Sequence, residues 1–131
     1  MQLTLRHDLI LTHVTVAYQG REAVIEDVAV DTGSATTLIS ADVLAQIGIV
    51  PEPADVLYTV RGVGGAEVVF SRRLDRLQTS YQAVEQFEVE VGGMDYGFAI
   101  NGILGMDYLL RTGAIINLAT LQLDFADVEG R

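Results

Sequence analysis

Hydrophobic and polar residues alternate along much of the chain, which is the pattern of strands that bury one face. The clearest case is residues 10–18, and the positions that share its apolar face are Ile10, Thr12, Val14, Val16 and Tyr18. The turn Gln19-Gly20-Arg21-Glu22 separates this segment from a second apolar run at residues 23–30. The pattern predicts a hairpin whose second strand leads directly into Asp31.

Three more regions have the composition of strands. Residues 57–61 and 66–70 flank a short glycine-rich turn and predict a second hairpin. Residues 72–91 predict two further strands, the second with one apolar and one acidic face. A last pair of strands is expected at residues 114–118 and 121–125.

Helices are predicted only where a capping residue precedes a short apolar run. Ser40 can cap a helix over residues 41–47, which Gly48 would end. Asp107 can cap a second, shorter helix, which Gly113 would end. The chain is therefore expected to be mainly β, with one or two short helices.

Size and composition limit the number of domains. The chain has 131 residues, of which 50% are hydrophobic and only two are proline. This is enough to bury one core, and the composition argues against disorder. We therefore expect a single domain that spans residues 1–131.

Charge and cysteine content exclude several classes of function. The formal net charge of −10 disfavours a nucleic acid or an anionic membrane as a partner. The chain has no cysteine, and two histidines are too few for a typical zinc site, so neither a metal nor another cofactor is expected. No stretch has the length of a membrane span, and the first residues lack the apolar run of a secretory signal. A cytoplasmic location is expected.

Asp31 needs an explanation because it directly follows the apolar run Val28-Ala29-Val30. A carboxylate at the end of a buried strand costs free energy unless neighbouring groups donate hydrogen bonds to it. Thr32 offers a hydroxyl, and Gly33 lets backbone N–H groups approach closely. The simpler alternative is a turn that closes a strand, since Asp and Gly are common turn residues.

Three motifs in order favour a specialised site over a simple turn. They are Asp31-Thr32-Gly33-Ser34 after an apolar strand, the glycine-rich stretch Arg61-Gly62-Val63-Gly64-Gly65, and a second motif, Asn101-Gly102-Ile103-Leu104-Gly105-Met106-Asp107. Together they resemble the retropepsin-like aspartic proteases. The resemblance implies a closed acid-protease barrel with a flap hairpin and one or two short helices.

The resemblance also implies an activity. Such proteins are aspartic endopeptidases, in which two carboxylates share one proton and activate a water molecule. One chain has only one such motif, so the resemblance implies a homodimer that joins two Asp31 side chains and acts on a peptide or protein substrate. Thr32 would form hydrogen bonds across the twofold axis, Gly33 would supply backbone N–H donors to the carboxylates, and Ser34 would donate to the outer oxygen of Asp31.

The other two motifs receive supporting roles from the same resemblance. The flap would contact the substrate through Arg61, Gly62, Val63, Gly64 and Gly65. The second motif would be structural, through Gly102, Ile103, Leu104, Gly105 and Asp107. A phosphate-binding loop is a poor alternative for the glycine-rich stretch, because it has no Lys-Ser/Thr ending and opens no helix.

Two positions depart from the retroviral members of this family. Those enzymes have an ion pair near the dimer interface, where this chain has Ala35 and Met106. Both charged partners are missing together, so no orphan buried charge results and the fold is not in doubt. The combination is closer to bacterial and cellular retropepsin-like proteins than to viral ones.

Other functions remain open on the same fold. The chain can be a catalytically silent module for peptide binding or dimerisation, although the intact motif at Asp31 argues against this. It can also be a monomer that is active only inside a larger assembly. Asp107 and Asp95 are weaker candidates for a paired carboxylate, because neither follows an apolar strand with Thr-Gly behind it.

The ends of the chain offer a candidate dimer interface. Alternating apolar residues near both ends would otherwise leave open strand edges, and they are Leu3, Leu5, Leu121, Leu123 and Phe125. We therefore expect the terminal strands to pair between two chains.

Overall fold

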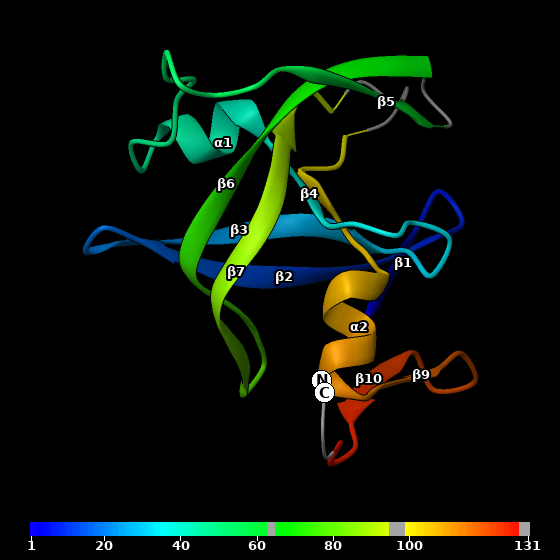
Figure 1. Cartoon of the computed structure of the whole chain (residues 1–131). Coiled ribbons are helices and arrows are strands. Elements are labelled where there is room, and N and C mark those ends of the chain that lie inside the picture. The colour runs from blue at the N-terminus through cyan, green and yellow to red at the C-terminus, as the bar shows by residue number, and fades with distance from the viewer. Residues whose placement is uncertain (63–64, 95–98, 129–131) are drawn as a thin grey trace.

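The computed structural model describes residues 1–62, 65–94 and 99–128 (Figure 1). The strands of the described part are β1 (Thr4–Arg6), β2 (Leu9–Tyr18), β3 (Arg21–Val30), β4 (Leu38–Ser40), β5 (Tyr58–Gly62), β6 (Gly65–Thr79), β7 (Gln82–Gly92), β8 (Gly102–Leu104), β9 (Ala114–Asn117) and β10 (Gln122–Phe125). The helices of that part are α1 (Ala41–Ala45) and α2 (Met106–Thr112).

Six strands close into a ring. The main sheet has the order β1-β2-β3-β8-β4-β7-β6-β5, and a further pairing of β2 with β6 joins its two halves. In Figure 1, β6 and β7 cross in front of β2 and β3, as expected for a sheet that curls around on itself. The predicted mainly β fold and the closed barrel are thus confirmed.

The β2–β3 hairpin forms where the alternation predicts it. Gln19 and Gly20 both have positive φ, at 49° and 82°, which is the geometry of a tight two-residue hairpin turn. Antiparallel pairing then places Val14 opposite Ile25, and both side chains are fully buried in the core. The hairpin therefore delivers the end of β3, and with it Asp31, to the edge of a packed barrel.

Tyr108 of α2 occupies the core beneath β7. It is fully buried, and its ring packs edge-on against Phe87 at a centroid distance of 6.0 Å. Its hydroxyl donates to the carbonyl of Gln82 at 2.6 Å and accepts from the N–H of Thr79 at 3.2 Å. Burial raises the pKa of Tyr108 to about 12, because the charged phenolate would lose its hydration.

The two helices are short, as expected. α1 has Ser40 as its N-cap, and the Ser40 hydroxyl accepts from the N–H of Val43 at 3.5 Å, but the helix is two residues shorter than predicted. α2 ends at Gly113 in the left-handed conformation, with a φ of 67°. Among the described residues, no helix combines the length and the apolar character needed to cross a membrane.

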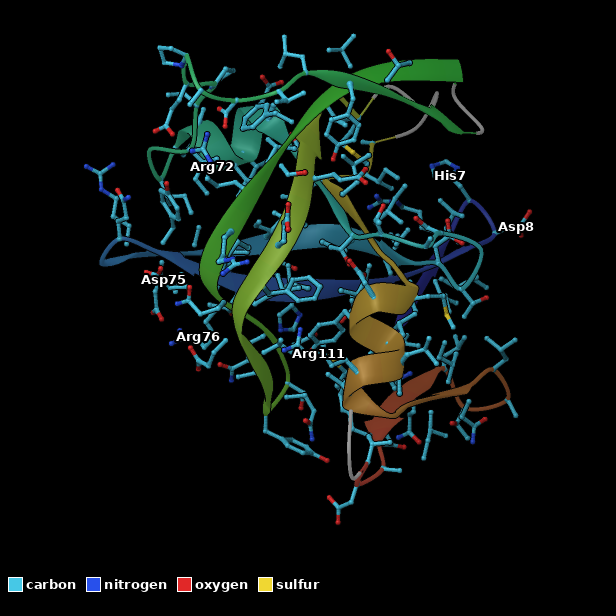
Figure 2. All side chains as sticks on the ribbon, viewed as in Figure 1. His7, Asp8, Arg72, Asp75, Arg76 and Arg111 are labelled. Atoms are coloured by element: carbon cyan, nitrogen blue, oxygen red, sulfur yellow. The ribbon has the colours of Figure 1, made fainter. Side chains whose placement is uncertain are left out.

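Strand β6 differs from the prediction, because it is continuous from Gly65 to Thr79. The sequence placed a break near Arg72, where a charged residue interrupts the apolar pattern. Arg72 is in fact buried, and its guanidinium donates to Asp55 Oδ2 at 2.6 Å and to the carbonyl of Val50 at 3.2 Å (Figure 2). These bonds replace water around the charge and fasten the loop after α1 to β6.

The terminal segments also differ from the prediction. The N–H of Leu3 donates to the carbonyl of Leu121 at 2.7 Å, so the first residues extend the β9–β10 sheet within the same chain. Leu3 and Leu123 are buried there, whereas Leu5 is exposed. The expectation that these strands stay open until a second chain covers them is therefore wrong for Leu3 and Leu123.

Candidate active site

Asp31 follows β3 at the point where two neighbouring strands hold it. β3 pairs antiparallel with β2 on one side and parallel with β8 on the other, with Val30 opposite Leu104. The N–H of Asp31 itself donates to the carbonyl of Leu104 at 3.0 Å. The position of the Asp31 backbone therefore depends on the second motif, which is far away in the sequence.

The turn after Asp31 places a backbone donor against its carboxylate and a second one against its carbonyl. The N–H of Gly33 donates to Asp31 Oδ1 at 2.8 Å, and the N–H of Ser34 donates to the carbonyl of Asp31 at 3.2 Å. A Cβ at Gly33 would lie only 3.1 Å from Asp31 Oδ1, so glycine permits this close approach. Asp31 is half-buried, while Thr32 and Gly33 are exposed on the surface of the chain.

Ser34 does not have the contact expected of it. Its hydroxyl donates to the carbonyl of Thr36 at 2.7 Å. Because a hydroxyl has a single proton, this bond leaves none for the outer oxygen of Asp31. Ser34 instead shapes the turn, and its own carbonyl accepts from the N–H of Met106 at 2.8 Å.

The second motif lies beside the Asp31 turn. Gly102, Ile103 and Leu104 form β8, which lies between β3 and β4 in the sheet. Gly105 follows, and a Cβ there would overlap the carbonyl oxygen of Thr36. The glycine therefore lets α2 begin directly against the segment that follows Asp31.

Asp107 is not the cap of α2, which was the prediction. Gly105 is the N-cap, and Asp107 lies within the first turn of the helix. Its carboxylate accepts from the Thr37 N–H at 3.0 Å, from the Thr37 hydroxyl at 2.7 Å and from the Tyr108 N–H at 2.8 Å. The Thr37 hydroxyl in turn accepts from the N–H of Gly105 at 3.1 Å. These bonds join the second motif to the chain after Asp31.

Thr37 was not singled out by the sequence. It is fully buried and accounts for most of the contacts just described. Its β-branched neighbours predicted only an extended segment, and no local pattern identifies a threonine that binds an aspartate 70 residues later. The only indication in the sequence that these two segments interact was the occurrence of the two motifs together.

Ala35 and Met106 are brought together, as their shared departure from the retroviral pattern implies. With Asp107, Leu110 and Arg111 they line a shallow hollow of about 430 Å³ next to the Asp31 turn. The surface of this hollow is mainly apolar. Uncharged side chains therefore occupy both positions of the retroviral charge pair, beside an apolar hollow.

The glycine-rich stretch lies at the end of a hairpin between β5 and β6. Their register places Arg61 opposite Ala66 and Gly62 opposite Gly65. Val63 and Gly64, which the sequence predicts to be the flap tip, lie outside the described residues, as does Asp95. A hairpin is thus present where the sequence predicts one, and its role as a flap stays a prediction.

The described residues contain no group of three or more His, Asp or Glu side chains that could hold a metal ion. At the end of β3 the described residues present a half-buried carboxylate that accepts a hydrogen bond from the backbone of Gly33.

The comparison with protein families now decides the assignment. A model of the family described as aspartyl protease matches residues 14–108, which run from β2 into the first turn of α2. The chain belongs to the aspartyl protease family. The match includes Asp31, the β5–β6 hairpin and the second motif, and it confirms the predicted relation to retropepsin-like proteins. The search of curated proteins found no match.

Proposed function

We propose that this aspartyl protease family member is an endopeptidase that works as a homodimer, with one Asp31 from each chain. The observation that carries the proposal is the position of Asp31, which follows β3, is fixed to Leu104 by its backbone and receives a hydrogen bond from Gly33. One chain supplies one such carboxylate. A second copy related by a twofold axis supplies the other.

The exposed groups around Asp31 support such an arrangement. Thr32 and Gly33 are exposed, and the Thr32 hydroxyl has no hydrogen bond to the described residues of its own chain. In the dimer we expect this hydroxyl to bond across the twofold axis. The apolar hollow at Ala35 and Met106 lies beside the same turn, and burying it would favour association.

The two carboxylates would share one proton, because like charges in contact cannot both ionise readily. The ionised Asp31 takes a proton from a water molecule, and the oxygen of that water attacks the carbonyl carbon of the peptide bond. The protonated Asp31 donates its proton to the carbonyl oxygen. Proton transfer to the amide nitrogen then breaks the C–N bond and releases two peptides. The β5–β6 hairpin would cover the substrate during these steps.

The test replaces Asp31 with Asn, which keeps the volume and removes the ionisable group. Cleavage of casein or of a peptide library should fall by about 10²- to 10⁴-fold, as expected when a general acid–base group is lost. Asp42→Asn is the matched control, because Asp42 is exposed in the first turn of α1. Sedimentation of both variants should show the same dimer as wild type.

Equal cleavage by wild type and Asp31→Asn would remove Asp31 from the mechanism. If no protein cleaves but all bind peptides, the chain is a silent peptide-binding module. An active monomer would contradict the homodimer.

A further inference from the structure

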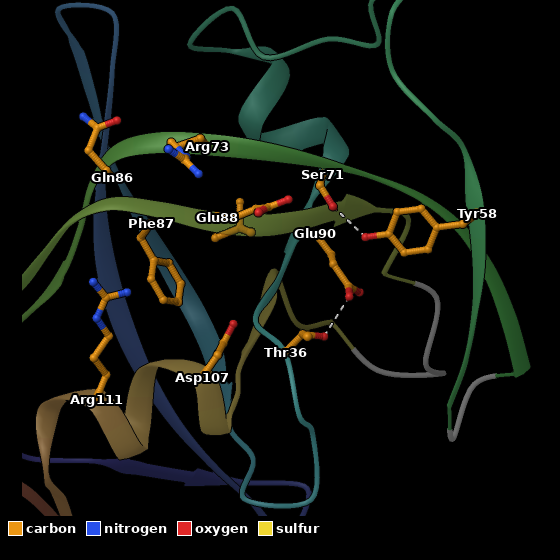
Figure 3. A pocket seen from close by; sticks show the side chains of 11 residues that line it. Thr36, Tyr58, Ser71, Arg73, Gln86, Phe87, Glu88, Glu90, Asp107 and Arg111 are labelled. Atoms are coloured by element: carbon orange, nitrogen blue, oxygen red, sulfur yellow. Dashed lines mark hydrogen bonds between the residues drawn. The ribbon is translucent and has the colours of Figure 1, made fainter. Parts of the chain in front are cut away.

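A polar cavity of about 500 Å³ lies next to the candidate active site, between the base of the β5–β6 hairpin, strands β6 and β7, and α2 (Figure 3). Two hydrogen bonds define one end of it. The Thr36 hydroxyl donates to Glu90 Oε1 at 2.9 Å, and the hydroxyls of Tyr58 and Ser71 are 2.6 Å apart. Thr36 belongs to the segment that follows Asp31, and Tyr58 opens the hairpin. This end therefore adjoins the proposed path of the substrate.

The other end lies further along the same strands. Ser71 pairs with Glu90 in the β6–β7 register, and Arg73 pairs with Glu88 two residues beyond. On α2, Arg111 is one helical turn after Asp107, on the same face of the helix. Figure 3 shows Arg73 and Arg111 on the side of the cavity away from Tyr58, with Phe87 between them. We call Arg73 and Arg111 the arginine end.

The two guanidinium groups of the arginine end are free to bind a ligand. All eight basic residues of the chain are arginine, against 18 acidic residues. Arg6, Arg72 and Arg76 each bind a carboxylate. Arg73 and Arg111 have no carboxylate within 4.0 Å among the described residues.

The carboxylates of Glu88, Glu90 and Asp107 also line the cavity, and none of them forms a salt bridge with the arginine end. Asp107 accepts three hydrogen bonds from Thr37 and Tyr108, and Glu90 accepts one from Thr36. Glu88 is exposed and forms no salt bridge with Arg73, although it pairs with it across the strands. An incoming carboxylate would therefore not have to displace an existing ion pair.

We propose that the arginine end recognises an acidic side chain of the substrate, several residues away from the peptide bond that is cleaved. The proposal rests on the proposed function, because it assigns this end of the cavity to the same peptide. An extended peptide that runs away from Asp31 and passes between Thr36 and Tyr58 would continue along the β6–β7 surface. A Glu or Asp on it would then reach two guanidinium groups, whose planar donors match a carboxylate.

The site would set specificity rather than perform chemistry. Arg73 and Arg111 are both exposed, so solvent weakens each contact with a carboxylate. An acidic residue at the right position should improve binding about three- to tenfold over its amide, and the preference should decline as salt is added. It should appear mainly in KM, because the contact lies away from the reacting bond and is made equally in the ground state and the transition state.

The experiment compares short peptides that differ only by Glu or Gln at one position, moved stepwise along the sequence. Binding is measured by fluorescence anisotropy in the Asp31→Asn background, and cleavage is measured with an intact Asp31. The variants are Arg73→Gln, Arg111→Gln and the double variant. Arg21→Gln is the matched control, since Arg21 is exposed, forms no salt bridge with the described residues and does not line the cavity.

We expect one position at which Glu is preferred over Gln, with the preference lost in the double variant and kept in Arg21→Gln. A preference that survives in the double variant, or none in wild type, would overturn the arginine end as an acidic subsite. A preference for Gln over Glu would mean that the carboxylates of Glu88 and Glu90 dominate the cavity instead. Binding that discriminates without any cleavage would leave this site standing and contradict the endopeptidase.

Discussion

Asp31 and Asp107 show how the surroundings of a carboxylate separate two roles. Asp107 accepts three hydrogen bonds that connect α2 to Thr37, so its oxygens are used within the fold. Asp31 accepts one, from Gly33, and has exposed neighbours. The motif around Asp31 could be predicted from the sequence. The partners of Ser34 and Asp107 could not, because they depend on segments brought together only by folding.

Tyr108 gives the clearest pH dependence at the scale of one residue. Its pKa is raised from 10 to about 12 in the fold, so the folded state holds this proton more tightly than the unfolded state. The associated stability is complete below about pH 10 and is lost as the pH rises toward 12, by at most ~2–3 kcal/mol.

Tyr108→Phe should remove this loss, so that unfolding between about pH 10 and 12 depends less on pH than in wild type. The variant should also lose about 1–3 kcal/mol near neutral pH, because the buried N–H of Thr79 and carbonyl of Gln82 lose their partner. Urea unfolding across the pH range measures both effects. Tyr81→Phe, at an exposed tyrosine, is the control, and equal pH slopes for wild type and Tyr108→Phe would contradict the assignment.

At the scale of elements, local alternation predicted most strands but not their continuity or partners. The β2–β3 hairpin was predictable because its turn and both strands are contiguous. β6 was predicted in two pieces, because the sequence alone does not show that Asp55 and Val50 satisfy the buried Arg72. β8 has only three residues and was not predicted as a strand, since a strand this short has little periodicity of its own; the sequence marked these residues only as part of the second motif.

The link between α2 and the Asp31 segment can be tested through Asp107. Asp107→Ala should lower the free energy of unfolding by about 2–4 kcal/mol, because buried Thr37 loses both of its bonds to the carboxylate. Asp42→Ala removes an exposed carboxylate from the first turn of α1 and should cost well under ~1 kcal/mol. Chemical denaturation measures both, and a similar small loss for the two variants would contradict a linking role for Asp107.

At the scale of the whole molecule, the first residues of the chain connect the ring of strands to the terminal sheet of β9 and β10. The barrel class followed from the motifs and the strand content, but the pairing of the first residues with β10 did not. That pairing joins opposite ends of the chain, and alternation alone does not choose between a partner in the same chain and one in a second chain. We therefore expect any dimer to use surfaces that remain open after the ends have paired.

Truncation after Leu118 tests the terminal sheet. The deletion removes buried Leu123 and exposes Leu3, so we expect loss of cooperative folding, where the open-edge hypothesis predicts a folded monomer. Loss of the buried Leu123 side chain alone should lower the free energy of unfolding by about 2–5 kcal/mol. Circular dichroism melting and sedimentation distinguish the two outcomes. Leu118→Ala, at an exposed position, should melt like wild type.

The position of β8 between β3 and β4 determines when Asp31 can be fixed in place during synthesis of the chain. Asp31 leaves the ribosome well before Leu104, so its N–H can bond to the carbonyl of Leu104 only after the segment between them has emerged. Such distant pairing forms late in folding. A growing chain thus has the Asp-Thr-Gly residues but no fixed carboxylate until the second motif has emerged.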